Sequence, residues 1–456
     1  MFLLSGEPDA GQSEESGARY SRTQSGDSLE YGFLSPCREP KRALLAFAQL
    51  KETPLSFSCV PPTQRSQRSA SRGNRAGAFR RVETGGELYE IFHPKPLPPD
   101  PPLDPSQLQD LGDRANQALG RLDGITLLLP NPEQFLYSYV RKEAVLSAQI
   151  EGTQSSLSEL LLFEHEHSPG VPRPEIAEPL NHVRALNHAL GRIEGGFPLS
   201  NRLLREAHAL LLEDTRGGET ARGEFRTSQN WIGGTRPGNA RFVPPPANEV
   251  GAAMSDLEKF LHGRPSHTPI LYKAALAHAQ FETIHPFLDG NGRLGRLLVT
   301  LLLCGDDCVL SKPVLFLSLY LKRHRDEYYE RLQRVRTHGE WEEWVRFFLE
   351  GLLEVAESAA ETTRRLLALV DTDRQRIQTL GRAATTAARL HEIAVREVVF
   401  RIPEAARRLE TSEVTVGTAA RNLEALDIVR ETTGRTRNRR FVYADYLAII
   451  EEGTGE

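Results

Sequence analysis

Apolar residues recur every three or four positions along most of the chain between residues 106 and 370, a spacing that is typical of amphipathic helices. Leu108, Leu111, Ala115 and Leu119, for example, fall on one face of a predicted helix. Helical patterns are predicted at residues 106–125, 131–152, 156–166, 175–193, 200–213, 249–263, 270–284, 294–304, 321–336 and 341–370. The fold class is therefore predicted to be mainly α.

Two stretches depart from the helical pattern. Residues 78–103 begin with a short strand-like stretch and end in a proline-rich segment that cannot continue a helix. Residues 226–246 hold two short β-prone pieces around a Gly/Pro/Asn turn, which predicts a β-hairpin.

The two ends of the chain also differ from the helical middle. Residues 1–76 are rich in Ser, Gly, Arg and Pro and bury too little apolar surface to offset their ordering entropy, so disorder is predicted there. Residues 400–450 alternate helix, turn, helix and a Gly/Arg-rich hairpin, the order of a winged helix-turn-helix. The predicted domains are a disordered extension (1–76), an N-terminal helical region (77–168), a catalytic core (169–354), a linker helix (355–385) and a winged helix-turn-helix (386–456).

The bulk composition narrows the class of protein. The 456 residues are 39% hydrophobic and 26% charged with a net charge of −5, which is typical of a soluble globular protein with no overall attraction to nucleic acid or membranes. The four cysteines fit no zinc or disulfide pattern, and Cys304 and Cys308, spaced for one helical face, are expected to be reduced and buried. No apolar run has the length of a membrane span, and the N-terminus lacks a secretion signal. A cytoplasmic location and no membrane partner are predicted.

The twelve residues "HPFLDGNGRLGR", His285–Arg296, interrupt two apolar helical stretches with an unusually polar loop. The "DGNG" part precedes a helix start and exposes successive backbone N–H groups, which favours anion binding. Asp289 beside it fits a Mg²⁺ ion that bridges phosphate oxygens.

Three further side chains of this loop fit phosphate chemistry. Arg293 and Arg296 share one face of the first helical turn, and guanidinium groups bind phosphate bidentately. His285 precedes the glycines and, as a neutral imidazole, could accept a proton from a hydroxyl. Each feature alone has an ordinary structural explanation, but together they are much more specific.

The loop resembles the signature of the Fic-domain family, HPFx(D/E)GNGRxxR, at every fixed position. The resemblance extends over about residues 77–350, and a C-terminal winged helix is a frequent companion of this family. It implies a helical fold and the transfer of AMP from ATP to a hydroxyl of a target protein.

The resemblance implies a role for each matching residue. His285 is expected to be the general base, Asp289 the Mg²⁺ ligand, Arg293 a support for the β-phosphate and Arg296 the holder of the γ-phosphate. Gly292 leaves room for the AMP-transfer pose, whereas relatives with lysine there can act as kinases. The nucleotide-binding residues implied are Gly290, Asn291, Gly292, Arg293, Leu294, Gly295 and Arg296 in the motif, with Trp231, Ile232, Gly233, Tyr328 and Tyr329 elsewhere.

For the predicted nucleotide-binding residues outside the motif, two interpretations are open. Trp231, Ile232 and Gly233 lie in "SQNWIGG", which resembles the family's flap, a strand edge that pairs with an extended target segment; the alternative is a structural hairpin. Tyr328 and Tyr329 fall where the family lines its adenine pocket, although aromatic residues in such a helix more often belong to the core.

The stretch "SAQIEG" carries a second resemblance. Glu151 ends a predicted helix, where the helix dipole disfavours negative charge, so a partner is expected. Ser147, Glu151 and Gly152 match the family's inhibitory motif (S/T)xxxE(G/N). By analogy, Glu151 pairs with Arg296 and removes the γ-phosphate contact, so that ATP binds unproductively.

The sequence thus predicts a self-inhibited protein adenylyltransferase that uses ATP and Mg²⁺ to modify a Ser, Thr or Tyr hydroxyl of an extended target segment, and also itself. One alternative is a DNA-binding regulator whose Fic core senses nucleotide; another is a Fic enzyme that removes AMP or transfers a different phosphate-containing group. DNA binding stays open, because the predicted wing is basic whereas residues 381–456 are near neutral overall. The basic wing residues are Arg430, Arg435, Arg437, Arg439 and Arg440. A homodimer is also left open.

Overall fold

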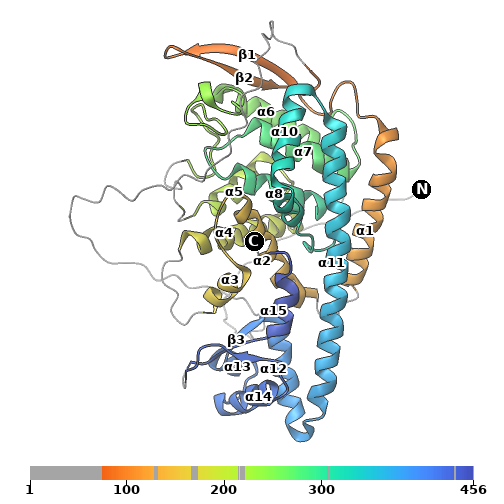
Figure 1. Ribbon diagram of the computed structural model, residues 1–456, viewed down its shortest axis with the longest axis vertical. Helices are drawn as coiled ribbons and strands as arrows, with labels where there is room; N and C mark the ends of the chain where they lie inside the picture. The colour runs from red at the N-terminus through yellow and green to blue at the C-terminus, as the bar shows by residue number, and fades with distance from the viewer. Residues whose placement is uncertain are drawn as a thin grey trace, which may run out of the picture. The chain divides into compact units, whose positions relative to one another are not determined.

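The computed structural model describes residues 74–127, 132–165, 173–213, 215, 221–305, 309–435 and 438–454 (Figure 1). Most of the predicted disordered extension lies outside these residues, but residues 74–76 are packed: Ala76 is buried and Arg75 donates to Glu342. Three of the four cysteines also lie outside them. Cys304 is half-buried rather than buried.

The described chain begins with an antiparallel hairpin of β1 (Gly77–Thr84) and β2 (Glu87–Pro94), in which Gly77 pairs with Pro94. The sequence predicted only one strand-like stretch here. Gly85 and Gly86, both with positive φ, make the turn. Phe92 of β2 is fully buried, and its N–H donates to the carbonyl of Val243 at 3.0 Å. The hairpin is therefore hydrogen-bonded directly to the 226–246 segment.

A mainly helical chain, as predicted, follows the hairpin. Its helices up to residue 378 are α1 (Gln109–Leu127), α2 (Pro132–Ile150), α3 (Leu157–Glu164), α4 (Pro174–Glu194), α5 (Asn201–Leu211), α6 (Ala247–Leu261), α7 (Ile270–Ile284), α8 (Asn291–Leu303), α9 (Ser318–Arg323), α10 (Arg325–His338) and α11 (Trp341–Gln378). Short 3₁₀ turns lie at Pro105–Gln107, Pro237–Asn239 and Gly381–Ala383. None of the helices in the described part is long and apolar enough to cross a membrane.

Helix α7 is the centre of this arrangement. Nearly every residue from Leu271 to Ile284 is buried, because α6, α8, α10 and α11 pack around it. The C-terminal end of α7 lies inside the fold, since Ile284 and, in the polar loop that follows, Phe287 are fully buried.

Two helices differ from their predicted extents. The stretch at 321–336 is broken at His324 (φ −109°, ψ 36°), which separates α9 from α10. Helix α11, in contrast, runs unbroken for 38 residues and ends at Gln378, beyond the predicted end at residue 370 (Figure 1). It packs against α1, α7 and α12.

The 226–246 segment is not the predicted two-stranded hairpin. Its only described pairing is one antiparallel bridge between Ile232 and Phe242, with the N–H of Ile232 donating to the carbonyl of Phe242 at 2.8 Å. The glycines after Ile232 and the prolines after Val243 prevent a longer ladder. The segment is a loop closed at its base by the bridge.

The C-terminal elements are α12 (Ala384–Glu397), β3 (Val399–Arg401), α13 (Ile402–Arg408), α14 (Glu413–Ala425), β4 (Arg430–Glu431), β5 (Arg440–Val442) and α15 (Ala444–Glu451). The three strands form an antiparallel sheet in the order β3-β5-β4. Ser412 caps α14 through a hydrogen bond to the N–H of Thr415. Arg437 lies outside the described residues.

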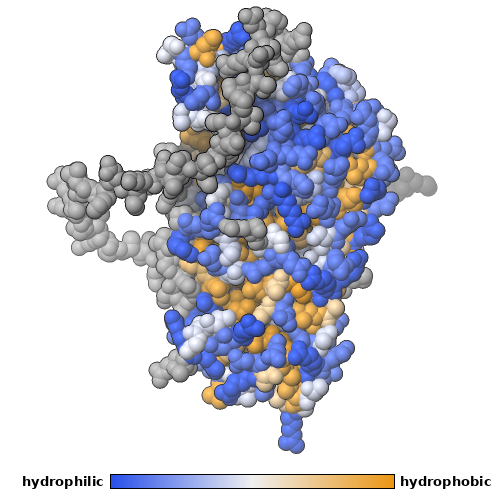
Figure 2. Space-filling model, in the orientation of Figure 1, coloured by the Kyte–Doolittle hydropathy of each residue, from blue (hydrophilic) through white to orange (hydrophobic). Residues whose placement is uncertain are grey.

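The C-terminal elements pack against α2 and α3. Lys142 of α2 donates to the carbonyl of Glu452 at 2.8 Å, and the N–H of Ser158 donates to the Glu451 carboxylate at 2.9 Å. Leu162 and Leu447 line a groove between α3 and α15, and Figure 2 shows hydrophobic side chains gathered in this region. Helix α2 therefore lies between the C-terminal elements and the helices around α7.

Candidate active site

The polar loop connects the buried helices α7 and α8 through two residues in the left-handed region. His285 ends α7 with φ 49° and ψ 61°, and its N–H donates to the carbonyl of Phe281. Gly290 precedes α8 with φ 73°. A left-handed histidine is strained, and such strain persists only where surrounding contacts fix it. The loop geometry is thus imposed by its neighbours.

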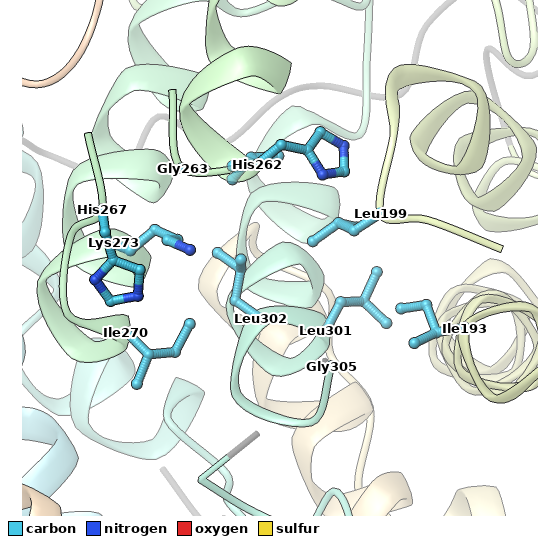
Figure 3. A pocket seen from close by; sticks show the side chains of 11 residues that line it. Ile193, Leu199, His262, Gly263, His267, Ile270, Lys273, Leu301, Leu302 and Gly305 are labelled. Atoms are coloured by element: carbon cyan, nitrogen blue, oxygen red, sulfur yellow. The ribbon is translucent and has the colours of Figure 1, made fainter. Parts of the chain in front are cut away.

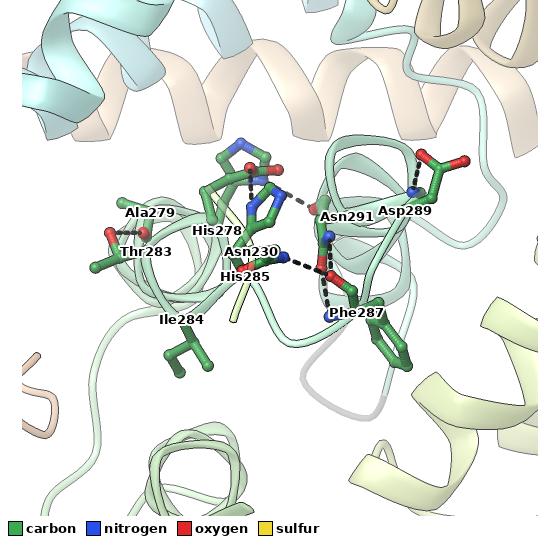
Figure 4. Close-up of polar contacts among 12 residues, drawn as sticks. Asn230, His278, Ala279, Thr283, Ile284, His285, Phe287, Asp289 and Asn291 are labelled. Carbon is green, nitrogen blue, oxygen red and sulfur yellow. Dashed lines mark hydrogen bonds and ion pairs between the residues drawn. The ribbon is translucent and has the colours of Figure 1, made fainter. Parts of the chain in front are cut away.

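Asn291 is one source of that constraint. Its side chain accepts from the N–H of Phe287 at 2.9 Å and donates to the carbonyl of Phe287 at 2.8 Å (Figure 4). The Phe287 ring is fully buried and stacks on His208 with 3.7 Å between the ring centroids. His208 in turn donates to the carbonyl of Asp289 at 3.1 Å. The loop is closed by its own asparagine and anchored by its phenylalanine.

Arg226 and Asn230 tie the 226–246 segment to this loop. The buried guanidinium of Arg226 donates to the carbonyl of His285 at 2.9 Å and to that of Ile284 at 3.4 Å. Asn230 donates to the carbonyl of Phe287 at 3.0 Å (Figure 4). Trp231, next in the chain, is 38% exposed. These bonds fix the start of the segment close to the loop.

A cavity of about 260 Å³ opens at the N-terminus of α8. Its lining residues are Glu151, Thr153, Glu178, His285, Leu288, Asp289, Gly290, Asn291, Gly292 and Arg293. The first turn of an α-helix leaves its N–H groups without partners inside the helix, and here those of Asn291, Gly292 and Arg293 lie at this cavity. The site combines helix-terminal N–H groups, an imidazole and a guanidinium, and it also contains three carboxylates.

A second cavity of similar volume lies near the opposite end of α8, beside Leu301, Leu302 and Gly305 (Figure 3). Lys273 and His267 point toward it. None of the sequence-predicted site residues lines this second cavity.

Arg296 is held by the C-terminal end of α2. Its Nη2 donates to Glu151 Oε1 at 2.7 Å and to the carbonyl of Ser147 at 2.9 Å, and its Nε donates to Ser147 Oγ at 2.9 Å. The Arg296 side chain is 2% exposed and that of Glu151 is 36% exposed. Burial by itself raises the pKa of Glu151, but the charge of Arg296, its hydrogen bond to Glu151 and the charge of Arg293 together hold that pKa below its usual value. The ion pair that the sequence predicted is present.

Gly292 makes room for this contact. A Cβ atom at position 292 would overlap with Oε1 of Glu151 and would lie 3.1 Å from Nη1 of Arg296. The Glu151 carboxylate therefore lies directly against the backbone of the first turn of α8, where nucleotide phosphates were predicted to bind.

His285 is a neutral imidazole in this environment. Burial, with the nearby charges of Arg336 and Arg226, lowers its pKa to about 3. Its Nδ1 lies 3.9 Å from Oε2 of Glu282, and burial raises the pKa of that carboxyl group to about 7. A neutral ring has one nitrogen free to accept a proton.

Asp289 and Arg293 lie on the exposed side of the cavity. Asp289 accepts from the N–H of Gly290 at 2.6 Å, its other oxygen lies 3.5 Å from Arg293 Nη2, and its side chain is 55% exposed. No group of three or more His, Cys, Asp or Glu residues in the described ranges is arranged to hold a metal ion. One accessible carboxylate beside helix-terminal N–H groups nonetheless fits Mg²⁺, which binds through one or two carboxylates together with substrate phosphates.

The remaining predicted residues divide between the core and the surroundings of the site. Leu294 and Gly295 are buried in α8, and Gly295 accepts from His278 at 2.9 Å. Tyr328 is 1% exposed and its hydroxyl donates to His278 at 2.9 Å, which makes it part of the core. Tyr329 is half-buried with its ring 5.0 Å from that of Tyr328, and it alone of the two leaves ring surface accessible. Neither tyrosine lines the cavity.

Sequence reasoning missed four residues around the site: His208, Arg226, Glu178 and Glu282. His208, Arg226 and Glu178 act through contacts with segments far away in the chain. Glu282 lies three residues before His285 but outside the recognised motif. A weak signal existed for Glu178 and Glu282, since acidic residues within otherwise apolar helical stretches are rarely buried unless paired. Nothing in the sequence identified their partners.

Part of this chain is similar to known proteins. Residues 109–191 match the profile of the Fic/DOC family N-terminal region, and residues 198–303 match that of the Fic/DOC family. A protein of Aedes aegypti named protein adenylyltransferase Fic is 36% identical over 130 residues, which are 28% of this chain and 23% of that protein. A protein of Aquifex aeolicus named as a probable protein adenylyltransferase is 28% identical over 183 residues, 40% of this chain and 52% of that protein.

One solved structure, titled as a Fic family protein from Desulfovibrio desulfuricans, superposes with a TM-score of 0.49 at 20% identity, covering 77% of this chain and 98% of that one. The chain spans about a quarter of the length of the mosquito relative. The two matched segments run from α1 through α8 and include residues 147–152, the cavity and the polar loop. Residues 109–303 of this chain therefore carry a Fic/DOC domain.

Proposed function

We propose that this chain is a protein adenylyltransferase, which transfers AMP from ATP to a hydroxyl group of a target protein and of itself. The observation that carries the proposal is the cavity at the N-terminus of α8, where His285, Asp289 and Arg293 meet the helix-terminal N–H groups. The curated relatives named above support the same activity. Arg296, three residues after Arg293 in the same helix, adds a second guanidinium group that can bind phosphate.

The buried guanidinium groups support nucleotide binding in particular. Nη1 of Arg296 and Nε and Nη1 of Arg293 are buried and have no hydrogen-bond partner. A buried donor without a partner costs about 1–3 kcal/mol, and phosphate oxygens would supply the missing acceptors. We assign the β-phosphate to Arg293 and the γ-phosphate to Arg296, and we propose that the N–H groups of Gly290, Asn291 and Gly292 cradle the phosphates.

His285 is the proposed general base. The target hydroxyl gives its proton to the neutral imidazole while its oxygen bonds to the α-phosphorus, and the bond from that phosphorus to the β-phosphate oxygen breaks. Pyrophosphate is the leaving group. Mg²⁺ held by Asp289 would neutralise charge on the α- and β-phosphates. The contribution of the chain is to position the reactants and to stabilise the charge that develops.

The target segment is proposed to bind along the 226–246 loop. Ile232 bonds to Phe242 on one side only, and its neighbours Trp231 and Gly233 are exposed enough to meet an extended peptide. Arg226 and Asn230 hold this loop against the carbonyls of His285 and Phe287. A peptide paired with the loop would therefore present its hydroxyl beside the imidazole.

Glu151 is proposed to inhibit this activity. Its carboxylate occupies Arg296, and it fills the space above Gly292 that a phosphate needs. A guanidinium whose charge is already paired binds a second anion weakly. If the competent state is populated to about 1%, the apparent productive affinity for ATP falls about 100-fold.

Mass spectrometry of the Glu151→Gly protein after incubation with ATP and Mg²⁺ tests the proposal. We expect one or more added adenylyl groups, and far fewer on the parent chain. An added phosphate would contradict AMP transfer, and equal labelling of the two proteins would contradict inhibition by Glu151. Removal of AMP from a previously modified protein would identify the reverse reaction.

A second candidate function concerns the C-terminal elements, which we interpret as a winged helix-turn-helix. Val414, at the start of α14, is 78% exposed beside Thr415 and Thr418, which line a groove of about 300 Å³. Hydroxyl and methyl groups on an exposed helix are suited to reading base edges. A salt-dependent shift of duplex DNA by the full chain, lost in Thr418→Asp, would support DNA binding. No shift at low salt would exclude DNA binding, and protein docking or dimer formation would remain as the function of these elements.

A cytoplasmic location stays a prediction.

A further inference from the structure

Glu178 is a second carboxylate from the N-terminal helices that enters the cavity. It lies in the second turn of α4 and its Oε2 is 3.4 Å from Nη1 of Arg293. Glu178 faces Arg293 as Glu151 faces Arg296, and Arg296 lies about one helical turn after Arg293 in α8. Each arginine of the polar loop thus faces one carboxylate supplied by another helix.

Arg293 is held less tightly than Arg296. Its side chain is 6% exposed, yet its contacts to Glu178 and Asp289 measure 3.4 and 3.5 Å, against 2.7 Å between Arg296 and Glu151. Its Nε and Nη1 are buried without a hydrogen bond. A guanidinium has five N–H donors, so most of the hydrogen-bonding capacity of Arg293 is unused. Glu178 neutralises this arginine without satisfying it.

Thr153 connects Glu178 to the inhibitory stretch. Its hydroxyl donates to Oε2 of Glu178 at 2.6 Å, so that one oxygen is shared between Thr153 and Arg293. Thr153 follows Glu151 by two residues, with Gly152 at φ 98° between them. A displacement of residues 151–153 that withdraws Glu151 from Arg296 would also break the bond to Glu178.

The charges of the cavity make this link relevant to nucleotide binding. Glu151, Glu178 and Asp289 supply three carboxylates against the two guanidinium groups of Arg293 and Arg296. The site therefore carries a net negative charge from these five groups before any ligand enters, and a polyphosphate is repelled. Removing Glu151 alone leaves the charges balanced; withdrawing Glu178 as well makes the site positive.

We propose that Glu178 is a second competitor of the nucleotide, which occupies Arg293 as Glu151 occupies Arg296, and that the Thr153 hydroxyl couples the two carboxylates so that they withdraw together. This rests on the proposed function only in assuming that both arginines bind nucleotide phosphates. Glu178 acts through Arg293 and is therefore an inhibitory positioning residue, not a catalytic one.

Two isosteric variants test the proposal, with ATP binding and AMP transfer measured on the full chain. In the Glu151→Gly background, Glu178→Gln should lower the Kd and the KM for ATP by about fivefold, because a partly exposed ion pair is worth little, and should leave kcat within about twofold. Glu175→Gln, one turn earlier on α4 and outside the cavity lining, is the matched control and should change neither.

Thr153→Val tests the coupling. In the parent chain it should raise AMP transfer about threefold, because each carboxylate then withdraws separately. In the Glu151→Gly background it should have no effect, since the coupled partner is gone. This non-additivity is the signature of a shared contact. Equal effects in the two backgrounds would exclude the coupling.

Other outcomes would overturn the role of Glu178. Weaker ATP binding or a lower kcat in Glu178→Gln would mean that Glu178 orients Arg293 for catalysis, and a higher Mg²⁺ requirement would make it a metal ligand. Because ATP binding is measured directly, the effect of Glu178→Gln on the Kd for ATP can be determined even if Glu151→Gly transfers no AMP. In that case the proposed function fails while the competition between Glu178 and nucleotide is still tested.

Discussion

The polar loop His285–Arg296 and the stretch Ser147–Gly152, for which we propose an inhibitory role, meet at Arg296 but are held differently. The loop is closed internally by Asn291 and is bonded to other segments through Arg226 and His208. The Glu151 carboxylate reaches the site from a helix end that is followed by residues without regular structure, and over a third of its side chain is exposed.

This difference separates two requirements. Phosphate transfer needs donors fixed before the substrate arrives, because reorganising them during the reaction costs rate. The proposed inhibition needs a contact that is strong yet removable, and Glu151 directly follows the last residue of α2. In the proposed function Arg296 serves both requirements, because it lies inside α8 whereas its partner lies at a helix end.

The largest effect on AMP transfer is expected from replacing His285, the proposed general base. His285→Ala in the Glu151→Gly background should lower AMP transfer by about 10²–10⁴-fold, the usual contribution of a general base. ATP binding should change little, because the imidazole does not hold the phosphates. Transfer of labelled AMP and the Kd for ATP measure the two. Retained transfer would show that another group accepts the proton.

The rigidity of the loop predicts the next effect. Asn291→Ala removes both bonds to Phe287 and leaves a buried N–H and carbonyl without that partner, so it should lower the free energy of unfolding by about 2–4 kcal/mol. Gln154→Ala, at an exposed position beyond Glu151, should change it by less than about 0.5 kcal/mol. Denaturant unfolding of both variants compares the regions directly; similar losses would mean that the two regions are equally constrained.

A smaller effect is expected from the second anchor of Arg296. Ser147→Ala removes the acceptor of its Nε but keeps Glu151 and the Ser147 carbonyl. AMP transfer should rise about fivefold, the factor that corresponds to a net loss of about 1 kcal/mol. Activation as large as that of Glu151→Gly would show that the hydroxyl, rather than the carboxylate, dominates the inhibition.

The smallest effect concerns pH. Since Arg296 holds the pKa of Glu151 below its usual value, the carboxylate stays ionised as pH falls from 8 to 6, and protonation weakens the ion pair only below that pKa. The ratio of AMP transfer by Glu151→Gly to that by the parent should therefore vary less than about twofold over this range. A ratio that falls toward one at pH 6 would mean that acid releases the inhibition.

Much of the local structure could be predicted from the sequence. Helix α7 spans the predicted residues 270–284, because an apolar stretch bounded by proline and a glycine-rich loop leaves little choice. The polar loop and the inhibitory stretch were recognised as motifs, because the chemistry of each is carried by residues close together in the chain. The 226–246 loop was predicted as a hairpin because two of its pieces have a high β-propensity. Whether such pieces form a ladder depends on their packing, which propensity does not include.

The sequence by itself predicted most of the helices and identified the residues to which we assign the phosphate chemistry, because both depend on spacing within a few turns. The tertiary structure decided what those residues contact. It placed Glu178 on Arg293, Arg226 beneath His285, and Tyr328 in the core rather than at a ligand surface. Such pairings join residues from about 50 to more than 100 positions apart, and they follow from how buried helices pack, which no local pattern records.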